Sequence, residues 1–344
     1  MRFLYFERKR FLGLRRAPIV VSGSFTSVYQ VLNFITLLEY FERSGFEYEA
    51  IVKFSSYWGE VDESIFKELS LLYRVNFVSL NEEFEALLPD MGSPRSIVEV
   101  KVNSAKMLPW ERKVVFTVDE GIGVFRTSVV RMYRSWAREC ARKNTSPSIS
   151  LIRYLAFFYI FRFRDSIFGA IRFSMVERRL GRFYENESFL SCYRSVIKRV
   201  SDQCKLDFGC EQDSDKPNFI FLTSPFVFLG ILSQCEMASL CKKIEEWCES
   251  RGYQLLIKPH PADNFRSQEF HFLRPDVPAE FYFQQLRNVS GVIGYNSTSL
   301  VTAKVAFRLS VYNLELDDFT QRGYVDPGIE GVINNYAESL DFSV

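Results

Sequence analysis

The chain has 344 residues, 47% of them hydrophobic and 25% charged, so it is long enough to form two domains of ordinary size with a sizeable core. Its net charge of +1 at pH 7 excludes a whole-chain preference for acidic or basic partners. No stretch of about 18 uncharged apolar residues occurs, and basic residues interrupt the N-terminus, so we expect neither a transmembrane helix nor a secretory signal.

The first half alternates between predicted strands and helices. An apolar strand at residues 18–21 leads through a polar loop into an amphipathic helix at 28–44, which is the usual opening of an α/β domain. The remaining elements predicted in this half are strands at 48–54, 75–80 and 113–118 and a helix at 65–73. The last strand ends at Asp119-Glu120-Gly121, where a glycine turn leaves a carboxylate exposed that can act as a general base. An acidic turn without function is the alternative.

A basic, aromatic and mostly helical segment follows. Residues 126–199 contain 16 Lys and Arg but only 5 Asp and Glu, and six of the first 16 residues are also basic. Such asymmetry favours a surface that meets phosphorylated lipid, a polyanionic acceptor or nucleic acid, and the alternative is a solvated helical face. Because no nucleic-acid-binding module is recognisable, we expect no nucleic-acid partner.

The second half repeats the alternation after a polar stretch. Residues 206–216 are predicted to link an N-terminal domain at 1–205 to a C-terminal domain at 217–344. The elements predicted beyond the linker are strands at 218–222, 254–257, 291–295 and 309–312 and helices at 236–251, 278–287 and 300–307. Two such alternations predict an α/β fold of two Rossmann-like domains that face each other across a cleft.

Histidine is rare in this chain, and one of its two histidines lies in the tetrapeptide Lys258-Pro259-His260-Pro261. The prolines end the preceding strand and fix the backbone on both sides of the imidazole. Folds of this class place their chemistry at the C-terminal ends of strands, so His260 is a candidate catalytic residue. An incidental histidine in a strand-end turn is the alternative, and His271 is interpreted as structural.

Hydroxyl side chains gather at a later strand-to-helix junction. Asn296 is followed by Ser297, Thr298 and Ser299, and their hydroxyls together with the N–H groups of a helix start can cradle a phosphate. A plain helix N-cap is the alternative. Glu280 lies at another predicted helix start. It can either bind ribose hydroxyls or simply stabilise the helix through its charge at the positive end of the helix dipole.

The ordered set of these motifs resembles the bacterial sialyltransferases, and in particular the capsular polysialyltransferase and lipooligosaccharide sialyltransferase group. The segments that carry the likeness are 119–123 (DEGIG), 257–262 (IKPHPA), 278–280 (PAE) and 294–299 (GYNSTS). The resemblance implies the GT-B architecture, CMP-sialic acid as the donor, inversion at the anomeric carbon and no requirement for a metal or other cofactor.

The resemblance also implies a role for each motif. Asp119 corresponds to the general base, with Glu120 as the alternative, and His260 to the group that stabilises or protonates the departing CMP phosphate. Ser297 and Thr298 would hold that phosphate, with Ser299 as an alternative, and Glu280 would bind the ribose. Pro261 and Gly121 are further expected donor-site positions.

Several functions remain open at this point. The resemblance implies a bacterial surface glycan as acceptor, either capsule or lipooligosaccharide. The alternatives are transfer of another CMP-activated sugar, such as Kdo, and a non-catalytic protein that binds glycans or a membrane surface. Seven cysteines without a CxxC pair predict free thiols in a reducing compartment. We therefore expect a cytoplasmic enzyme with peripheral contact to the inner membrane through its basic segments.

Overall fold

The computed structural model divides into two compact units. The first contains residues 1–55, 73–174 and 326–329, and the second contains 56–72, 175–325 and 330–344. The residues that the structure describes are 19–55, 61–78, 96–102, 114–119, 121, 133, 137, 140, 146, 150–153, 155–156, 171–179, 182–204, 216–286, 288–316 and 326–342.

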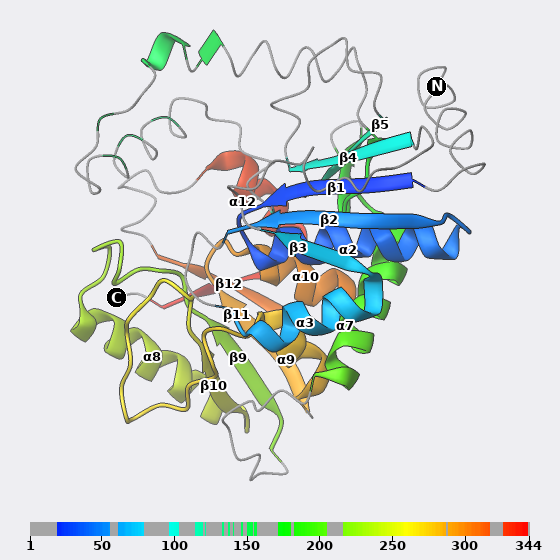
Figure 1. The fold of residues 1–344 in the computed structure, drawn as a ribbon. Coiled ribbons are helices and arrows are strands. Elements are labelled where there is room, and N and C mark those ends of the chain that lie inside the picture. The colour runs from blue at the N-terminus through cyan, green and yellow to red at the C-terminus, as the bar shows by residue number, and fades with distance from the viewer. Residues whose placement is uncertain are drawn as a thin grey trace. The chain divides into compact units, whose positions relative to one another are not determined.

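The first unit is built on a parallel sheet with the strand order β3-β2-β1-β4-β5-β6 (Figure 1). Its strands are β1 (Ile19–Phe25), β2 (Tyr48–Phe54), β3 (Val75–Val78), β4 (Ser96–Val102), β5 (Val114–Val118) and β6 (Ile171–Arg172). This order is that of a Rossmann fold, in which the direction of winding reverses between β1 and β4. Strand β4 was not predicted from the sequence.

Helix α2 (Val28–Arg43) connects β1 to β2 and packs its apolar side on the sheet. Its first turn is capped by Ser27, whose Oγ accepts a hydrogen bond from the N–H of Gln30 at 3.3 Å. The Phe34 ring of the helix lies 5.2 Å from the Phe25 ring at the end of β1, measured between centroids. A strand followed by a buried helix therefore begins this unit as predicted, although β1 runs to Phe25 through most of the predicted loop.

The second unit contains another all-parallel sheet, with the order β10-β9-β11-β12-β13. Its strands are β9 (Asn218–Leu222), β10 (Gln254–Lys258), β11 (Val289–Gly294), β12 (Ser310–Glu315) and β13 (Glu338–Asp341). The chain runs from β9 to β10 on one side and then crosses to β11 on the other, so the winding reverses between β9 and β11. Ligands of such sheets bind at the C-terminal ends of the strands beside this reversal.

Helices of the second unit follow its strands in alternation. They are α7 (Glu187–Gln203), α8 (Gln234–Glu249), α9 (Ala279–Gln285), α10 (Thr298–Phe307) and α12 (Pro327–Ile333), of which α12 shares its first residues with the first unit. Close packing constrains the sheet between them: a Cβ on Gly291 of β11 would approach the Phe219 ring of β9 to 2.4 Å. A side chain at this position would force the two strands apart.

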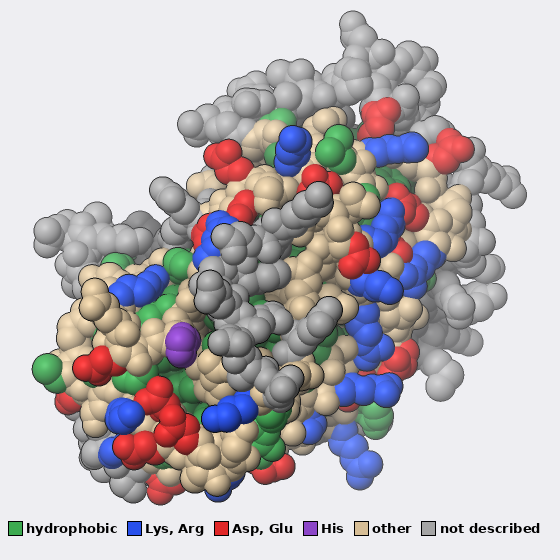
Figure 2. Space-filling view, turned by 90° about the horizontal axis from the view of Figure 1, so that it is seen from below, with side chains coloured by type: hydrophobic (Ala, Val, Ile, Leu, Met, Phe, Trp, Pro, Cys, Tyr) green, Lys and Arg blue, Asp and Glu red, His purple; other side chains and the backbone are tan. Residues whose placement is uncertain are grey.

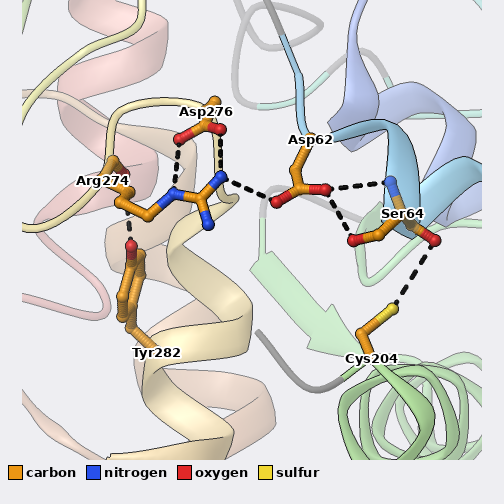
Figure 3. A network of polar contacts seen from close by, with 6 residues as sticks. All are labelled: Asp62, Ser64, Cys204, Arg274, Asp276 and Tyr282. Atoms are coloured by element: carbon orange, nitrogen blue, oxygen red, sulfur yellow. Dashed lines mark hydrogen bonds and ion pairs between the residues drawn. The ribbon is translucent and has the colours of Figure 1, made fainter. Parts of the chain in front are cut away.

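Helix α3 (Glu63–Tyr73) comes from the N-terminal half of the sequence, yet its first ten residues belong to the second unit. Figure 3 shows the polar network that anchors its start. Arg274 donates from Nη2 to Asp62 at 2.7 Å and also pairs with Asp276, while Asp62 accepts from the N–H of Ser64 at 2.9 Å. The network fixes both the start of α3 and the chain around Arg274.

The prediction of an α/β fold with two Rossmann-like domains is confirmed by these two sheets. The segment predicted as helical at 126–199 is more mixed. Within it, β7 (Val176–Arg179) and β8 (Arg182–Glu185) form an antiparallel pair, and only α7 is a long described helix.

The predicted linker lies outside the described residues except for Lys216, so the boundary at 205 stays a prediction. Helix α7, which precedes that linker, packs with the second unit: Arg194 donates from Nε to the carbonyl of Ala306 at 2.6 Å. Among the helices that the structure describes, none combines the length and the apolar character needed to cross a bilayer.

Candidate active site

Three neighbouring strands of the second unit end at one edge of its sheet. Thr223 and Ser224 follow β9, His260 follows β10, and Asn296 follows β11. Since β9 pairs in parallel with both β10 and β11, these residues meet at the C-terminal edge where the winding reverses. Side-chain bonds tie the three ends together: Thr223 Oγ1 accepts from the N–H of His260 at 2.9 Å, and Ser224 Oγ donates to the carbonyl of Tyr295 at 3.2 Å.

His260 begins a tight turn. The N–H of Asp263 donates to the carbonyl of His260 at 2.9 Å, which is the bond of a β-turn with Pro261 in its second position. The N–H of Ala262 donates to Nδ1 of the imidazole at 3.1 Å. Backbone and ring are therefore both held by groups next to them, as the flanking prolines predicted.

The bond from Ala262 decides which nitrogen of His260 carries the proton. A backbone N–H can only donate, so Nδ1 must be an acceptor and the proton of the neutral ring lies on Nε2. Burial of the imidazole and the nearby charge of Lys258 lower the pKa of His260 to about 4. The ring is therefore a neutral hydrogen-bond donor at neutral pH when no ligand is bound.

The start of α10 is shaped by Asn296 and Ser297. Asn296 has a left-handed backbone with φ of 43°, and its N–H donates to Asn313 Oδ1 at 2.8 Å. Ser297 is the N-cap, and its Oγ accepts from the N–H of Ser299 at 3.3 Å. The N-cap interpretation of Ser297 is thus confirmed, and α10 begins at Thr298, two residues before the predicted start.

Glu280 lies on α9 and is only 3% exposed. Its Oε1 accepts a hydrogen bond from Ser299 Oγ at 3.0 Å. Burial raises the pKa of this carboxyl, whereas the bond from Ser299 and the charge of Lys258 lower it in part. The structure brings Glu280 and Ser299 together, but a role in ribose binding stays a prediction.

Asp119 belongs to the first unit, directly after β5. The prediction of an exposed carboxylate is wrong here: Asp119 is only 6% exposed, because it packs under Arg172, whose Nη2 donates to Oδ1 at 3.0 Å. Its backbone carbonyl accepts from Asn33 Nδ2 on α2 at 2.9 Å. Gly121 has a φ of 110°, a conformation that glycine adopts readily, as the predicted turn requires. Glu120, the alternative base, lies outside the described residues.

Sequence reasoning missed four residues that fix the predicted ones. Arg172 and Asn33 are distant from Asp119 in the sequence, so no local pattern points to them. Thr223 directly follows a predicted strand, and a single hydroxyl in that place is not a distinctive signal. Lys258 was visible in the tetrapeptide with His260 but was assigned no role.

The first comparison with known proteins concerns the sequence. The family model for alpha-2,8-polysialyltransferase matches residues 114–312, which is more than half of the chain and includes Asp119, His260 and the Ser297–Ser299 segment. The chain belongs to this family. The polysialyltransferase assignment confirms the predicted resemblance and makes the protein a glycosyltransferase of the sialyltransferase class, so the non-catalytic alternative is set aside. Among curated proteins, no match to the chain is found.

The second comparison concerns solved structures. S. aureus MnaA in complex with UDP has a TM-score of 0.50 at 9% identity, covering 95% of this chain and 84% of its own. UDP-GlcNAc 2-epimerase from Methanocaldococcus jannaschii has a TM-score of 0.50 at 8% identity, with 95% and 89% covered. The 2,6-sialyltransferase of Photobacterium sp. JT-ISH-224, solved with CMP and lactose, scores 0.48 at 9% identity, with 94% and 78% covered. At 9% and 8% identity, the two scores of 0.50 concern the fold alone, and the two Rossmann-like units are those of the GT-B architecture.

The surface of this member of the family carries charges of both signs. Figure 2 shows Lys and Arg side chains next to Asp and Glu side chains over the described part of the face seen from below. Most of the basic segment at 126–170 lies outside the described residues. Within the described part of the chain, no group of three or more His, Cys, Asp or Glu side chains is arranged to hold a metal ion.

Proposed function

We propose that this polysialyltransferase moves sialic acid from CMP-sialic acid to a hydroxyl group of a bacterial surface glycan, with inversion at the anomeric carbon and without a metal. The observation that carries the proposal is the edge of the second sheet. There the His260 turn and the hydroxyl-rich start of α10 are joined through Thr223 and Ser224 at the end of β9. A reversal point of this kind is a nucleotide-binding position in doubly wound folds.

The side chains at this edge suit the departure of CMP. When the bond between the anomeric carbon and the phosphate oxygen breaks, its electron pair stays on that oxygen and CMP leaves as a phosphate monoester. His260 would donate Nε2–H to this phosphate, and Ser297, Thr298 and the first N–H groups of α10 would donate further hydrogen bonds. Ser299 Oγ donates its proton to Glu280, so in this arrangement it is not a donor for the phosphate.

Asp119 is our proposed general base. As the acceptor hydroxyl oxygen bonds to the anomeric carbon, its proton would pass to the Asp119 carboxylate, so one bond forms and one breaks in a single displacement. Arg172 at 3.0 Å and the anchored Asp119 carbonyl give this carboxylate a fixed orientation. Inversion requires the base and the leaving group to act on opposite faces of the sugar.

The family name supports a more specific acceptor. An alpha-2,8-polysialyltransferase would extend chains that already end in sialic acid, and such chains are polyanions. The excess of positive charge at 126–199 fits an anionic acceptor of this kind, and also peripheral contact with the inner face of the membrane where capsule or lipooligosaccharide is assembled.

Release of CMP from a panel of CMP-sugars tests the proposal. We expect turnover with CMP-sialic acid and a sialylated acceptor, persistence of that turnover in EDTA, and its loss in His260→Ala with the fold preserved. A preference for CMP-Kdo would favour the alternative donor, and no turnover with any CMP-sugar would contradict the proposed donor class. The anomeric configuration of the product, read by NMR, tests inversion.

A further inference from the structure

Lys258, the residue before the Pro-His-Pro turn, has its ammonium group inside the protein. The side chain is 5% exposed, and Nζ donates to the carbonyl of Pro259 at 2.9 Å and to the carbonyl of Pro275 at 3.1 Å. A buried ammonium is costly unless its N–H groups are bonded. A lysine in this position therefore implies a task that an apolar residue of the same length could not perform.

The Pro275 carbonyl belongs to a segment that several hydrogen bonds hold in place. Its two neighbours in the sequence, Arg274 and Asp276, pair with each other, and Arg274 also bonds to Asp62 (Figure 3). Tyr282 of α9 donates from its hydroxyl to the carbonyl of Arg274 at 3.3 Å. Because this segment is anchored on both sides, Lys258 ties the Pro259 carbonyl, and with it the turn of His260, to a rigid support.

Charged groups on three segments surround Lys258. Burial lowers the pKa of its ammonium to about 7, the carboxylates of Glu280 and Asp276 oppose that change, and Arg266 adds to it. Glu280 is buried as well and accepts a hydrogen bond from Ser299 at the start of α10. In the other direction, the charge of Lys258 contributes to the low pKa of His260. The charge of Lys258 thus acts on both Glu280 and His260.

We propose that Lys258 is a positioning residue for His260: its Nζ joins the Pro259 carbonyl to the Pro275 carbonyl and so holds the histidine turn in place. Without Lys258 the turn loses the hydrogen bond to the Pro259 carbonyl, and the imidazole loses its fixed orientation. The consequence for catalysis rests on the proposed function, in which His260 contacts the leaving phosphate. The effect of Lys258 on the orientation and protonation of the imidazole does not depend on the proposed function, and it can be measured without substrate.

The small number of histidines makes the measurement direct. A sample labelled with ¹⁵N in the imidazole rings gives signals from His260 and His271 only, and a His271→Asn variant assigns them. In the wild type we expect His260 to be neutral at pH 7 with its proton on Nε2 and to titrate near pH 4. A ring that titrates near the ordinary value of about 6.5, or that carries its proton on Nδ1, would overturn the proposal without any substitution.

Lys258→Met tests the support itself, because it keeps the length of the side chain and removes both the donor and the charge. We expect the His260 titration to move upward toward the ordinary range, the signal of the Nε2–H form to lose its dominance, and kcat to fall about 10- to 100-fold. Lys242→Met is the matched control, since Lys242 is exposed on α8 and pairs with Glu245 at 2.8 Å. This control should leave the His260 signals and kcat unchanged.

A folded Lys258→Met protein with unaltered His260 signals would overturn the proposal. If that variant does not fold, two measurements still test the proposal. The first is the wild-type titration of His260. The second is Lys258→Arg, which keeps a cation with several donors and, when folded, should keep the neutral Nε2–H ring. Failure of the proposed function gives a different result, namely altered His260 signals in Lys258→Met without any CMP release by the wild type.

Discussion

His260 illustrates how a few local contacts set the chemistry of one residue. The sequence predicted a rigid histidine at a strand end but left open whether the ring protonates the leaving group or only binds it. The bond from the Ala262 N–H and the pKa of about 4 make the ring a neutral donor at Nε2 before substrate arrives. A bound phosphate would stabilise the protonated ring, so proton donation becomes feasible only with the nucleotide in place.

The low pKa of His260 predicts a specific pH dependence of stability. The unfolded chain binds this proton below about 6.5, whereas the folded protein binds it only below about 4. Stability contributed by the neutral ring is therefore complete above pH 6.5 and is lost as the pH falls toward 4. Urea unfolding at several pH values should show a steeper loss for the wild type than for His260→Gln in this window. Parallel curves would contradict the low pKa.

Asp119 and Glu120 can be separated by paired amide substitutions. With Asp119 as the base, Asp119→Asn should lower kcat about 10²- to 10⁴-fold while CMP binding, measured by calorimetry, stays within a few-fold of the wild type. Glu120→Gln is the matched control and should keep most of the activity. The opposite ranking of the two variants would move the role of base to Glu120.

At the scale of elements, the start of α10 is the motif where function and helix capping overlap. Ser297 caps the helix with its side chain, as the sequence alone favoured, and the same oxygen lies at the edge proposed for phosphate. A capping role and a binding role therefore cannot be told apart from the motif itself. Another capped helix of the same unit provides the comparison: the N-cap of α8 is Ser233, whose Oγ accepts from the Glu236 N–H at 3.2 Å in a capping box.

Ser297→Ala and Ser233→Ala should differ in one respect only. Each removes an N-cap, so each should lower the free energy of unfolding by about 1 kcal/mol in urea titrations. Only Ser297→Ala should also weaken CMP binding in calorimetry, because only that hydroxyl lies beside the His260 turn. Equal CMP affinities for the two variants would reduce Ser297 to a helix cap.

The regular elements followed from the sequence wherever hydrophobic period and flanking residues agreed. Strands β2, β9 and β10 were predicted to within one residue of their observed ends and α8 to within two, whereas β1 runs four residues past its predicted end at Val21. Strand β4 was missed although Glu99 and Lys101 alternate with its apolar residues, which is the pattern of a half-buried strand. The pairing of β7 with β8 was missed because a run of arginines suggested an exposed helix. Contacts such as Arg172 with Asp119 depend on tertiary structure and have no local signal.

At the scale of the whole molecule, charge segregation gives the protein a property that no single residue has. The segment 126–199 carries a net positive charge in a chain that is nearly neutral overall. If it attracts a polyanionic acceptor, KM for a long sialylated chain should rise steeply with salt between about 0.05 and 0.3 M, because screening shortens the reach of these charges to about 10 Å. KM for an acceptor with one sialic acid should rise less. An equal rise of KM with salt for the two acceptors would mean that the acceptor does not bind at the basic segment 126–199.

The central claim is that the edge formed by the His260 turn and the start of α10 binds the phosphate of the donor nucleotide. A crystal structure of the wild-type protein with CMP tests it most directly. We predict that the phosphate lies within hydrogen-bond distance of His260 Nε2 and of the hydroxyls or N–H groups of Ser297 and Thr298, with the nucleotide over the ends of β9 and β11. A phosphate bound away from both motifs would contradict this assignment of the donor site.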